Sequence, residues 1–534
     1  MAKADRAAIP ARSSNSPIPS VAALFSSRRW LAVLIVLAII FVIATVLLAR
    51  YFPYSEKNVT KSIQETFPST VKIDRYETVY FPHPGCKAEG VTFRSNSSSP
   101  GSPPVVTIQE LTIQGSYADI LVRPHHISRV ILHNLRVQIP RLSKAGDFSG
   151  GYTASRTTIG ELVANGTVLE IARANDKPSL RFDIHELSLG SVSAKDGMSY
   201  RVTMQNPEPP GEIRSTGHFG PFNAGNPGQT PMSGTYSFRR GDLGAFHGIA
   251  GLIDSEGKFL GPFVNVDVQG TTDIPDFEIV RSGHAARLGT RFHASVNGTN
   301  GDVTLNAVNA SYLGTQISAK GNIAGKSGTP GKFTSLDFTV RDGRVQDILR
   351  FVVKDNRPPM SGVIGFRAHV TIPPEGKPFL EEVALVGDFE IAGGHFEKSS
   401  RQESVNKLSE TARGQKKAQQ NEEEQDPADN VISHVQSQVV LRNGVATFPD
   451  LSFTVPGADA RMHGTFNVLN QKIDFHGTVK MDARFSQSTS GIKSLFAKVL
   501  DPFFNKKQGS VVPVVMDGAY HDPHFGIDLN PIKK

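Results

Sequence analysis

From residue 71 onward, apolar and polar residues alternate along most of this chain. Residues 130–139 (VILHNLRVQI) and 303–307 (VTLNA) show the pattern. Successive side chains of a strand point to opposite faces of a sheet, so short alternating runs predict β-strands with one apolar face. We expect roughly 18–22 such strands, and the predicted fold class is therefore mainly β.

The connections between these runs predict antiparallel pairing. Arg442-Asn443-Gly444 separates the apolar residues 439–441 from the run 445–448. Asn-Gly is a strong signal for a two-residue hairpin turn, and hairpins join antiparallel neighbours. The sequence therefore predicts a meander without βαβ crossovers.

A loose repeat, apolar-x-apolar-x-Gly, accompanies the strands. A glycine inside a strand marks a bulge, a bend or a close approach between backbones. At matching places in successive strands, such glycines would bend a sheet along a line. The repeat occurs at residues 266–271, 294–299, 317–321, 460–465, 473–478 and 514–518.

Few segments predict helices that could cover the apolar face. Residues 55–67, 242–253 and 347–353 are short candidates. The sheet must therefore close on itself, or its apolar face must meet something other than protein. We expect an elongated, twisted antiparallel groove that holds acyl chains, although an ordinary protein core is the alternative. The residues expected to line this lipid groove are Val266, Val268, Val303, Leu305, Ile317, Phe338, Phe453, Val455, Phe475 and Val479.

Residues 30–49 (WLAVLIVLAIIFVIATVLLA) contain neither a charge nor a proline. As a helix this segment would rise about 30 Å, the hydrocarbon thickness of a bilayer. It exceeds the apolar region of a cleavable signal peptide and ends without the usual cleavage site, so we expect an uncleaved single-pass anchor, with a cleaved signal peptide as the alternative. The basic residues of the tail 1–29 place that tail in the cytoplasm and the rest across the membrane. The anchor residues include Trp30, Leu31, Leu34, Ile35, Leu37, Ile39, Phe41, Ile43, Leu47 and Leu48.

Two further segments differ from the strand pattern. Residues 491–501 predict an amphipathic helix whose apolar stripe has helical spacing. This helix would either plug the end of the sheet or act as a gate that docks on a membrane or partner. Residues 401–430 form a charged insertion or disordered loop, to which we assign no role. The stripe residues of the helix are Ile492, Leu495, Phe496, Val499 and Leu500.

The chain lacks the usual signs of an enzyme. It contains no nucleophile elbow, phosphate-binding loop, dinucleotide fingerprint or zinc-protease motif. Cys86 is the only cysteine, and neither His125-His126 nor His521 with His524 has further ligands at evident spacing. The net charge of +7 is dispersed, without the basic stripe of nucleic-acid binders. We therefore expect no catalysis, cofactor, metal or nucleic acid.

Two long stretches resemble a known family. They are residues 104–140 (PVVTIQELTIQGSYADILVRPHHISRVILHNLRVQIP) and 443–504, the latter followed by 511–522 (VVPVVMDGAYHD). Together with the anchor, they are similar to AsmA-like proteins, which in turn resemble TamB and the bridge-like lipid-transfer proteins. The resemblance implies a bacterial inner-membrane protein with a periplasmic β-groove body at 50–400 and an AsmA-like C-terminal domain at 431–534. It implies a role in outer-membrane lipid homeostasis.

Two functions from different classes follow. In the first, the protein binds or conducts phospholipid, or another acyl-chain lipid, in the groove and supports envelope biogenesis. In the second, it is a non-enzymatic assembly factor that binds an outer-membrane or periplasmic protein through the edges of its sheet.

Overall fold

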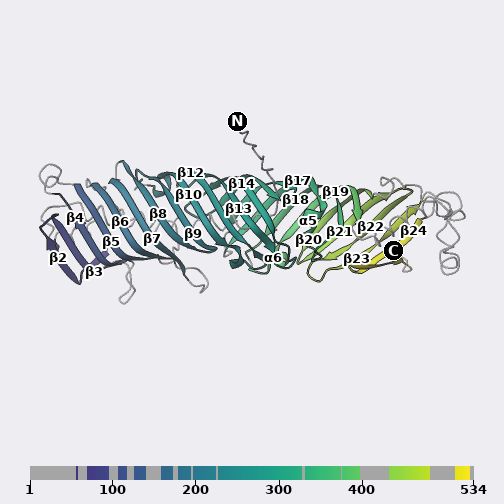
Figure 1. Cartoon of the computed structure of the whole chain (residues 1–534), viewed down its shortest axis with the longest axis horizontal. Helices are drawn as coiled ribbons and strands as arrows, with labels where there is room; N and C mark the ends of the chain where they lie inside the picture. Colours follow the sequence, from purple (N-terminus) through teal and green to yellow (C-terminus); the bar gives the residue numbers. More distant parts are fainter. Residues whose placement is uncertain are drawn as a thin grey trace, which may run out of the picture.

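The computed structural model forms one elongated sheet of 25 strands (Figure 1). Apart from residues 56, 57 and 60, the part of the chain that the structure describes comprises residues 69–95, 106–116, 126–139, 158–171, 179–193, 196–223, 226–326, 331–374, 376–396, 432–481 and 511–528. The prediction of a mainly β fold is confirmed, and the sheet has more strands than the sequence pattern suggested.

The strands are mostly 9 to 14 residues long. The first twelve are β1 (Ser69–Lys72), β2 (Arg75–Val79), β3 (Gly85–Ser95), β4 (Val106–Gln114), β5 (His126–Ile139), β6 (Thr158–Ile171), β7 (Leu180–Ser193), β8 (Gly197–Pro207), β9 (Pro210–Phe219), β10 (Pro231–Asp242), β11 (Ile249–Ala250) and β12 (Leu252–Pro262). The others are β13 (Val266–Ile279), β14 (Ala286–Val296), β15 (Val303–Tyr312), β16 (Thr315–Gly325), β17 (Lys332–Arg344), β18 (Met360–Ile372), β19 (Ala384–Phe396), β20 (Ser433–Arg442), β21 (Val445–Val455), β22 (Ala458–Asn467), β23 (Lys472–Met481), β24 (Val511–Ala519) and β25 (Asp522–Ile527).

Nearly every strand pairs with the next one in the sequence. The exceptions are β1, which pairs with β3 as β2 also does, and the two-residue β11, which pairs with β13 while β10 pairs with β12. The expected hairpin at Asn443-Gly444 is present, because both residues have positive φ and Arg442 pairs with Val445. Strands β19 and β20 pair directly, so residues on both sides of the segment 401–430 belong to the same sheet.

One pairing departs from the predicted antiparallel meander. Strands β5 and β6 are parallel, with Leu132 opposite Ala164. A parallel pair needs a connection long enough to return the chain to the same end of the sheet. Residues 140–157, which lie between the two strands, supply that length. The other strand pairs within the described residues are antiparallel, as predicted.

The register defines an apolar face that runs along the sheet. Residues opposite each other on paired strands share a face. One row of such partners runs from β3 to β20 and contains no charged residue. The row consists of Ala88, Leu111, Leu132, Ala164, Leu187, Val202, Ser215, Tyr236, Gly257, Gly270, Phe292, Val308, Ala319, Phe338, Ala368, Gly387 and Val439. We call this side of the sheet the apolar face and the opposite side the polar face.

The strand glycines mark close approaches, as the sequence suggested. A Cβ atom on Gly270 would lie 2.7 Å from both the Glu256 carbonyl oxygen and the Tyr236 hydroxyl oxygen. A Cβ atom on Gly477 would lie 2.7 Å from Met462 Cα on the neighbouring strand. These positions have no room for a larger side chain, which explains the choice of glycine.

Helices in the described residues are few and short. They are the 3₁₀ turns η1 (Pro227–Gln229) and η2 (Leu243–Ala245) and the helices α5 (Val345–Leu349) and α6 (Phe379–Glu382). The helix expected at 347–353 is confirmed in part by α5. The helix expected at 242–253 is wrong, because Gly248 and Gly251 take positive φ values and the chain turns from η2 into β11 and β12.

Several predicted elements lie outside the described residues. They are the anchor at 30–49, most of the helix at 55–67, the insertion at 401–430 and the amphipathic helix at 491–501. Among the residues that the structure does describe, no helix combines the length and apolarity needed to cross a bilayer.

Candidate functional site: the apolar face

The structure places the ten expected groove residues on the apolar face. Phe338 belongs to the row defined above, and Val268 lies two residues from Gly270 of the row, on the same side of β13. Val303 and Leu305 pair with residues of β14 and β16 that lie on this side of the sheet. On the C-terminal strands, Phe475 pairs with Gly464, which in turn pairs with Phe448. Nine of the ten are at most 8% exposed, and Phe453 is half-buried. The ten residues therefore lie on the side of the sheet that alternation predicted.

The apolar face extends beyond the predicted residues. Strands β3 to β9 contribute side chains with almost no exposed surface, including Leu132, Leu135, Phe182 and Leu189. These residues belong to the same buried cluster as Val303 and Leu305, and that cluster reaches from Val71 to Val468. A second cluster follows at the C-terminal strands, where Val455, Ala460 and Val479 pack together. The sequence pattern in β4 and β5 carried the same alternating signal.

Buried hydroxyl groups cross the apolar face near its middle. Tyr200 Oη lies 3.2 Å from Ser215 Oγ, and Tyr236 Oη lies 3.2 Å from Ser255 Oγ. Burial raises the pKa of each tyrosine to about 12, against the weaker opposing effect of its serine partner. Thr272 Oγ1 and Thr290 Oγ1, 2.6 Å apart, continue the line. These groups are neutral and paired, so they add hydrogen bonds to the apolar face without adding charge.

Segments from the strand ends close over the apolar face. The Phe379 N–H of α6 donates to the His247 carbonyl oxygen at 3.0 Å, and Phe379 and Leu380 are buried in the main cluster. After α5, the ring of Phe351 stacks on Tyr312 with centroids 4.3 Å apart. The cavity lined by Phe259, Val268 and their neighbours has a volume of about 20 Å³. The apolar face is therefore packed against its own chain at this point, and a cavity of this size holds no acyl chain.

Two observations concern possible reactive groups among the described residues. They contain no group of three or more His, Cys, Asp or Glu side chains arranged to hold a metal ion. Cys86 is fully buried, and burial raises the pKa of its thiol to about 11 despite a hydrogen bond with Tyr76. At neutral pH this thiol is protonated, and a protonated thiol is a poor nucleophile.

The polar face contains a hollow that the alternation of the sequence did not predict. A hollow of about 1400 Å³ lies there, lined mainly by arginines, carboxylates and uncharged polar groups of β10 to β17 and α5. Its residues occupy polar positions of ordinary strands, so the sequence contained no signal that they would gather around a hollow.

Comparison of the chain with protein-family models, with curated proteins and with solved structures finds no match.

Proposed function

We propose that this protein is a membrane-anchored lipid-binding protein whose apolar face holds and conducts the acyl chains of phospholipids. The uninterrupted apolar row from β3 to β20 is the observation that carries the proposal. Most proteins bury such a face under helices or a second sheet. In the described part of this chain, α5 and α6 have only five and four residues, so helices cover little of this face and side chains of the sheet itself bury the rest.

Acyl chains match this face in chemistry and in shape. A long apolar strip without charges offers each methylene group of a chain about 0.8 kcal/mol on leaving water. Along the apolar row, the only polar groups are hydroxyls that are already hydrogen-bonded. An acyl chain would therefore meet no single position that holds it much more tightly than the next. We infer that the closed packing is the empty state, and that lipid displaces α6 and the side chains beneath it.

The sequence supports the cellular setting of this proposal. Residues 30–49 would anchor the chain in a bacterial inner membrane, with the sheet in the periplasm. The resemblance of residues 104–140 and 443–522 to AsmA-like proteins points to the same compartment. The partners would be phospholipid, the inner membrane and an acceptor at the outer membrane.

Photocrosslinking from paired positions tests the proposal. The full-length chain would carry benzoylphenylalanine in place of Phe338 or Phe453 on the apolar face, and in place of Asp337 or Ser452 beside them on the polar face. We expect phospholipid adducts in cells, detected by mass spectrometry, from the first pair and not from the second. Equal adducts from both pairs, or none from Phe338 and Phe453, would contradict lipid binding at this face.

The free ends of the sheet favour a second candidate function, strand addition. Within the described residues, β25 pairs with β24 alone and β2 pairs with β3 alone. An unpaired edge can accept a strand of another protein. Benzoylphenylalanine in place of His524 on β25 would then yield an adduct with an outer-membrane or periplasmic protein, while Phe338 yields no lipid adduct.

A further inference from the structure

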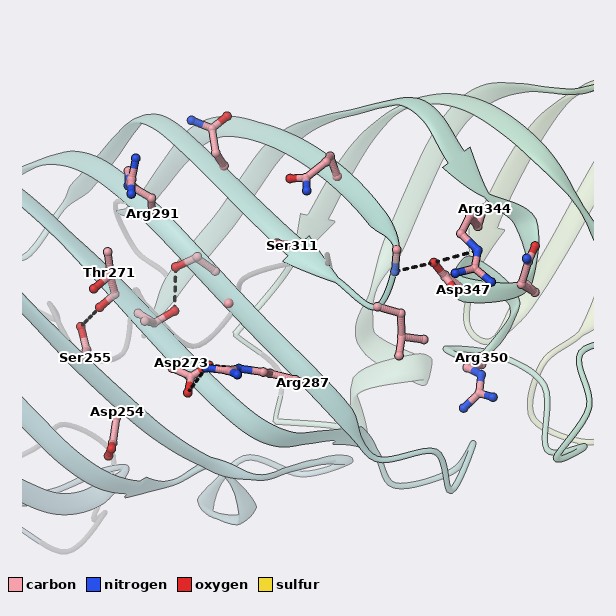
Figure 2. Close-up of a pocket in the computed structure, with 18 of the residues that line it drawn as sticks. Asp254, Ser255, Thr271, Asp273, Arg287, Arg291, Ser311, Arg344, Asp347 and Arg350 are labelled. Atoms are coloured by element: carbon pink, nitrogen blue, oxygen red, sulfur yellow. Dashed lines mark hydrogen bonds and ion pairs between the residues drawn. The ribbon is translucent and has the colours of Figure 1, made fainter. Parts of the chain in front are cut away.

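Figure 2 shows side chains that line the hollow on the polar face. Its floor includes a cross-strand row in which Glu256 pairs with Thr271, Thr271 with Arg291 and Arg291 with Asn309. These residues alternate with Phe292 and Val308, which belong to the apolar row. The polar face therefore forms most of the hollow, whose lining also includes Ser255, Thr272 and Thr290 from the line of buried hydroxyl groups.

Six arginines and four carboxylates line the hollow. Each carboxylate already has basic or hydrogen-bonding partners. Arg287 binds Asp273 through two contacts of 2.7 and 3.1 Å, and this pairing raises the pKa of the Arg287 guanidinium. Arg239 contacts Asp254 at 3.5 Å and Glu256 at 2.9 Å. The arginines are Arg239, Arg287, Arg291, Arg344, Arg350 and Arg357.

Asp347, the fourth carboxylate, is committed to the structure of the wall. Its side chain is 4% exposed and accepts hydrogen bonds from the Gly314 N–H at 3.0 Å and the Thr315 hydroxyl at 2.9 Å. Arg344 lies 3.9 Å away. These contacts fix α5 beside β16 and hold Arg344 and Arg350 at one end of the hollow (Figure 2).

Three arginines remain without a carboxylate partner in the described part of the chain, and the six arginines and four carboxylates together carry a net charge of +2. Within the described residues, Arg291, Arg350 and Arg357 form no ion pair with a carboxylate. Arg291 and Arg350 lie at opposite ends of the group of side chains in Figure 2, with Arg287 between them. Unpaired guanidinium groups in a hollow concentrate positive potential and attract anions. Their separation requires a ligand with more than one anionic group.

The other lining residues narrow the class of ligand. Thr271, Asn309, Ser311 and Gln316 offer hydroxyl and amide groups, and no aromatic side chain lines the hollow. Single-stranded nucleic acids bind on aromatic side chains that stack with their bases, so this lining does not suit them. The hollow also exceeds the roughly 300–1,000 Å³ of a pocket for a small molecule. We propose that it binds an extended anionic oligosaccharide, with arginines on the acidic groups and the neutral side chains on sugar hydroxyls.

Binding of labelled sugars to the full-length chain in mild detergent tests this site. The probes are a fluorescent heparin hexasaccharide, the neutral maltohexaose and the oligonucleotide dT₆, each followed by fluorescence anisotropy. The test variant carries Arg291→Gln, Arg350→Gln and Arg357→Gln. The control variant carries Arg136→Gln, Arg201→Gln and Arg461→Gln, which remove the same charge from exposed positions outside the hollow.

We expect the heparin hexasaccharide to bind the native chain and to lose at least tenfold in affinity in the test variant. The control variant should stay within twofold of the native chain, and added salt should weaken binding. An equal loss in both variants would show attraction to overall charge, and dT₆ binding as tightly as the sugar would show a general polyanion surface. Either result, or the absence of hexasaccharide binding, would overturn the proposal.

Discussion

Gly464 shows how one residue sets the spacing between two strands. It lies on β22 opposite Phe475 of β23, and an added Cβ atom would come within 2.6 Å of Phe475 Cα. We expect Gly464→Ala to lower the free energy of unfolding by about 1–3 kcal/mol, the usual cost of overpacking. Urea denaturation measures the change.

Gly365 on β18 provides the matched control. An added Cβ atom there would meet nothing within 4 Å. Gly365→Ala should therefore leave stability unchanged or raise it slightly, because alanine restricts the unfolded chain. A similar loss in both variants would mean that the effect comes from strand propensity and not from the close approach.

His476 links the last strands in a pH-dependent way. Its Nδ1 lies 2.8 Å from Asp528 and its Nε2 lies 3.1 Å from Asp474. The hydrogen bond with Asp528 raises the pKa of His476, against partial burial and with support from the charge of Asp474. A raised pKa in the folded state stabilises the protonated form.

This stabilisation is fully present below the unfolded-state pKa of about 6.5 and disappears as the pH rises through the higher folded-state pKa. We expect urea unfolding of the C-terminal strands to show the loss, with His476→Gln abolishing this part of the pH dependence. A pH dependence that survives the substitution would assign it to other groups.

At the scale of residues, alternation identified the apolar face correctly. Val303, Leu305 and Phe338 occupy the face that their spacing predicted, because a strand leaves only two directions for a side chain. Arg291 and Arg350 could not be recognised in the same way. Their importance depends on a hollow formed by strands β10 to β17, and polar positions on a strand look alike in sequence.

At the scale of elements, α6 closes the apolar face. It has four residues, and Phe379 and Leu380 are buried in the main cluster. We expect Phe379→Ala to destabilise the chain by about 3–5 kcal/mol, as for other buried phenylalanines. If lipid enters by displacing α6, the same variant should take up fluorescent phospholipid from vesicles faster than the native chain.

Leu260→Ala is the control for this prediction, because Leu260 is 66% exposed and does not belong to the main buried cluster. It should change neither stability nor uptake. Slower uptake in Phe379→Ala, at protein concentrations corrected for the folded fraction, would show that α6 helps to bind lipid and does not exclude it.

Short elements were the least predictable part of the fold. Helix α6 has only four residues, too few to show a helical period in the sequence. The segment 242–253 has an apolar pattern that predicted a helix, but Gly248 and Gly251 take positive φ values and interrupt it. The parallel pairing of β5 with β6 also left no local mark, since hairpin residues signal antiparallel pairs only. Longer elements such as β13 and β17 were evident from their alternation, whereas β9 lies in a stretch rich in proline and glycine that is typical of a loop.

At the scale of the whole molecule, lipid that moves along the apolar face must pass distant residues one after another. Leu305 on β15 and Phe475 on β23 lie on the same face, many strands apart. If lipid passes both, Leu305→Asp or Phe475→Asp alone should slow transfer between donor and acceptor vesicles strongly, and the double variant should be no slower than the slower single variant. The measurement is the rate of fluorescent-lipid transfer.

An ordinary core gives a different result. Destabilisation by distant substitutions adds, so the double variant would then be about as impaired as the sum of the two single variants predicts. Thr304→Asp and Thr478→Asp, at exposed positions on the polar face of the same two strands, add the same charge and should leave transfer intact.

The pairing of each strand with its neighbour in sequence makes the length of the molecule easy to change in evolution. Duplicating or deleting one hairpin lengthens or shortens the sheet by two strand spacings, about 10 Å. Such a change restores the direction of the chain and keeps every apolar residue on its own side, so the remaining strands need no new partners. A gene for this fold can therefore adjust the reach of its product to the width of the compartment it occupies, one hairpin at a time.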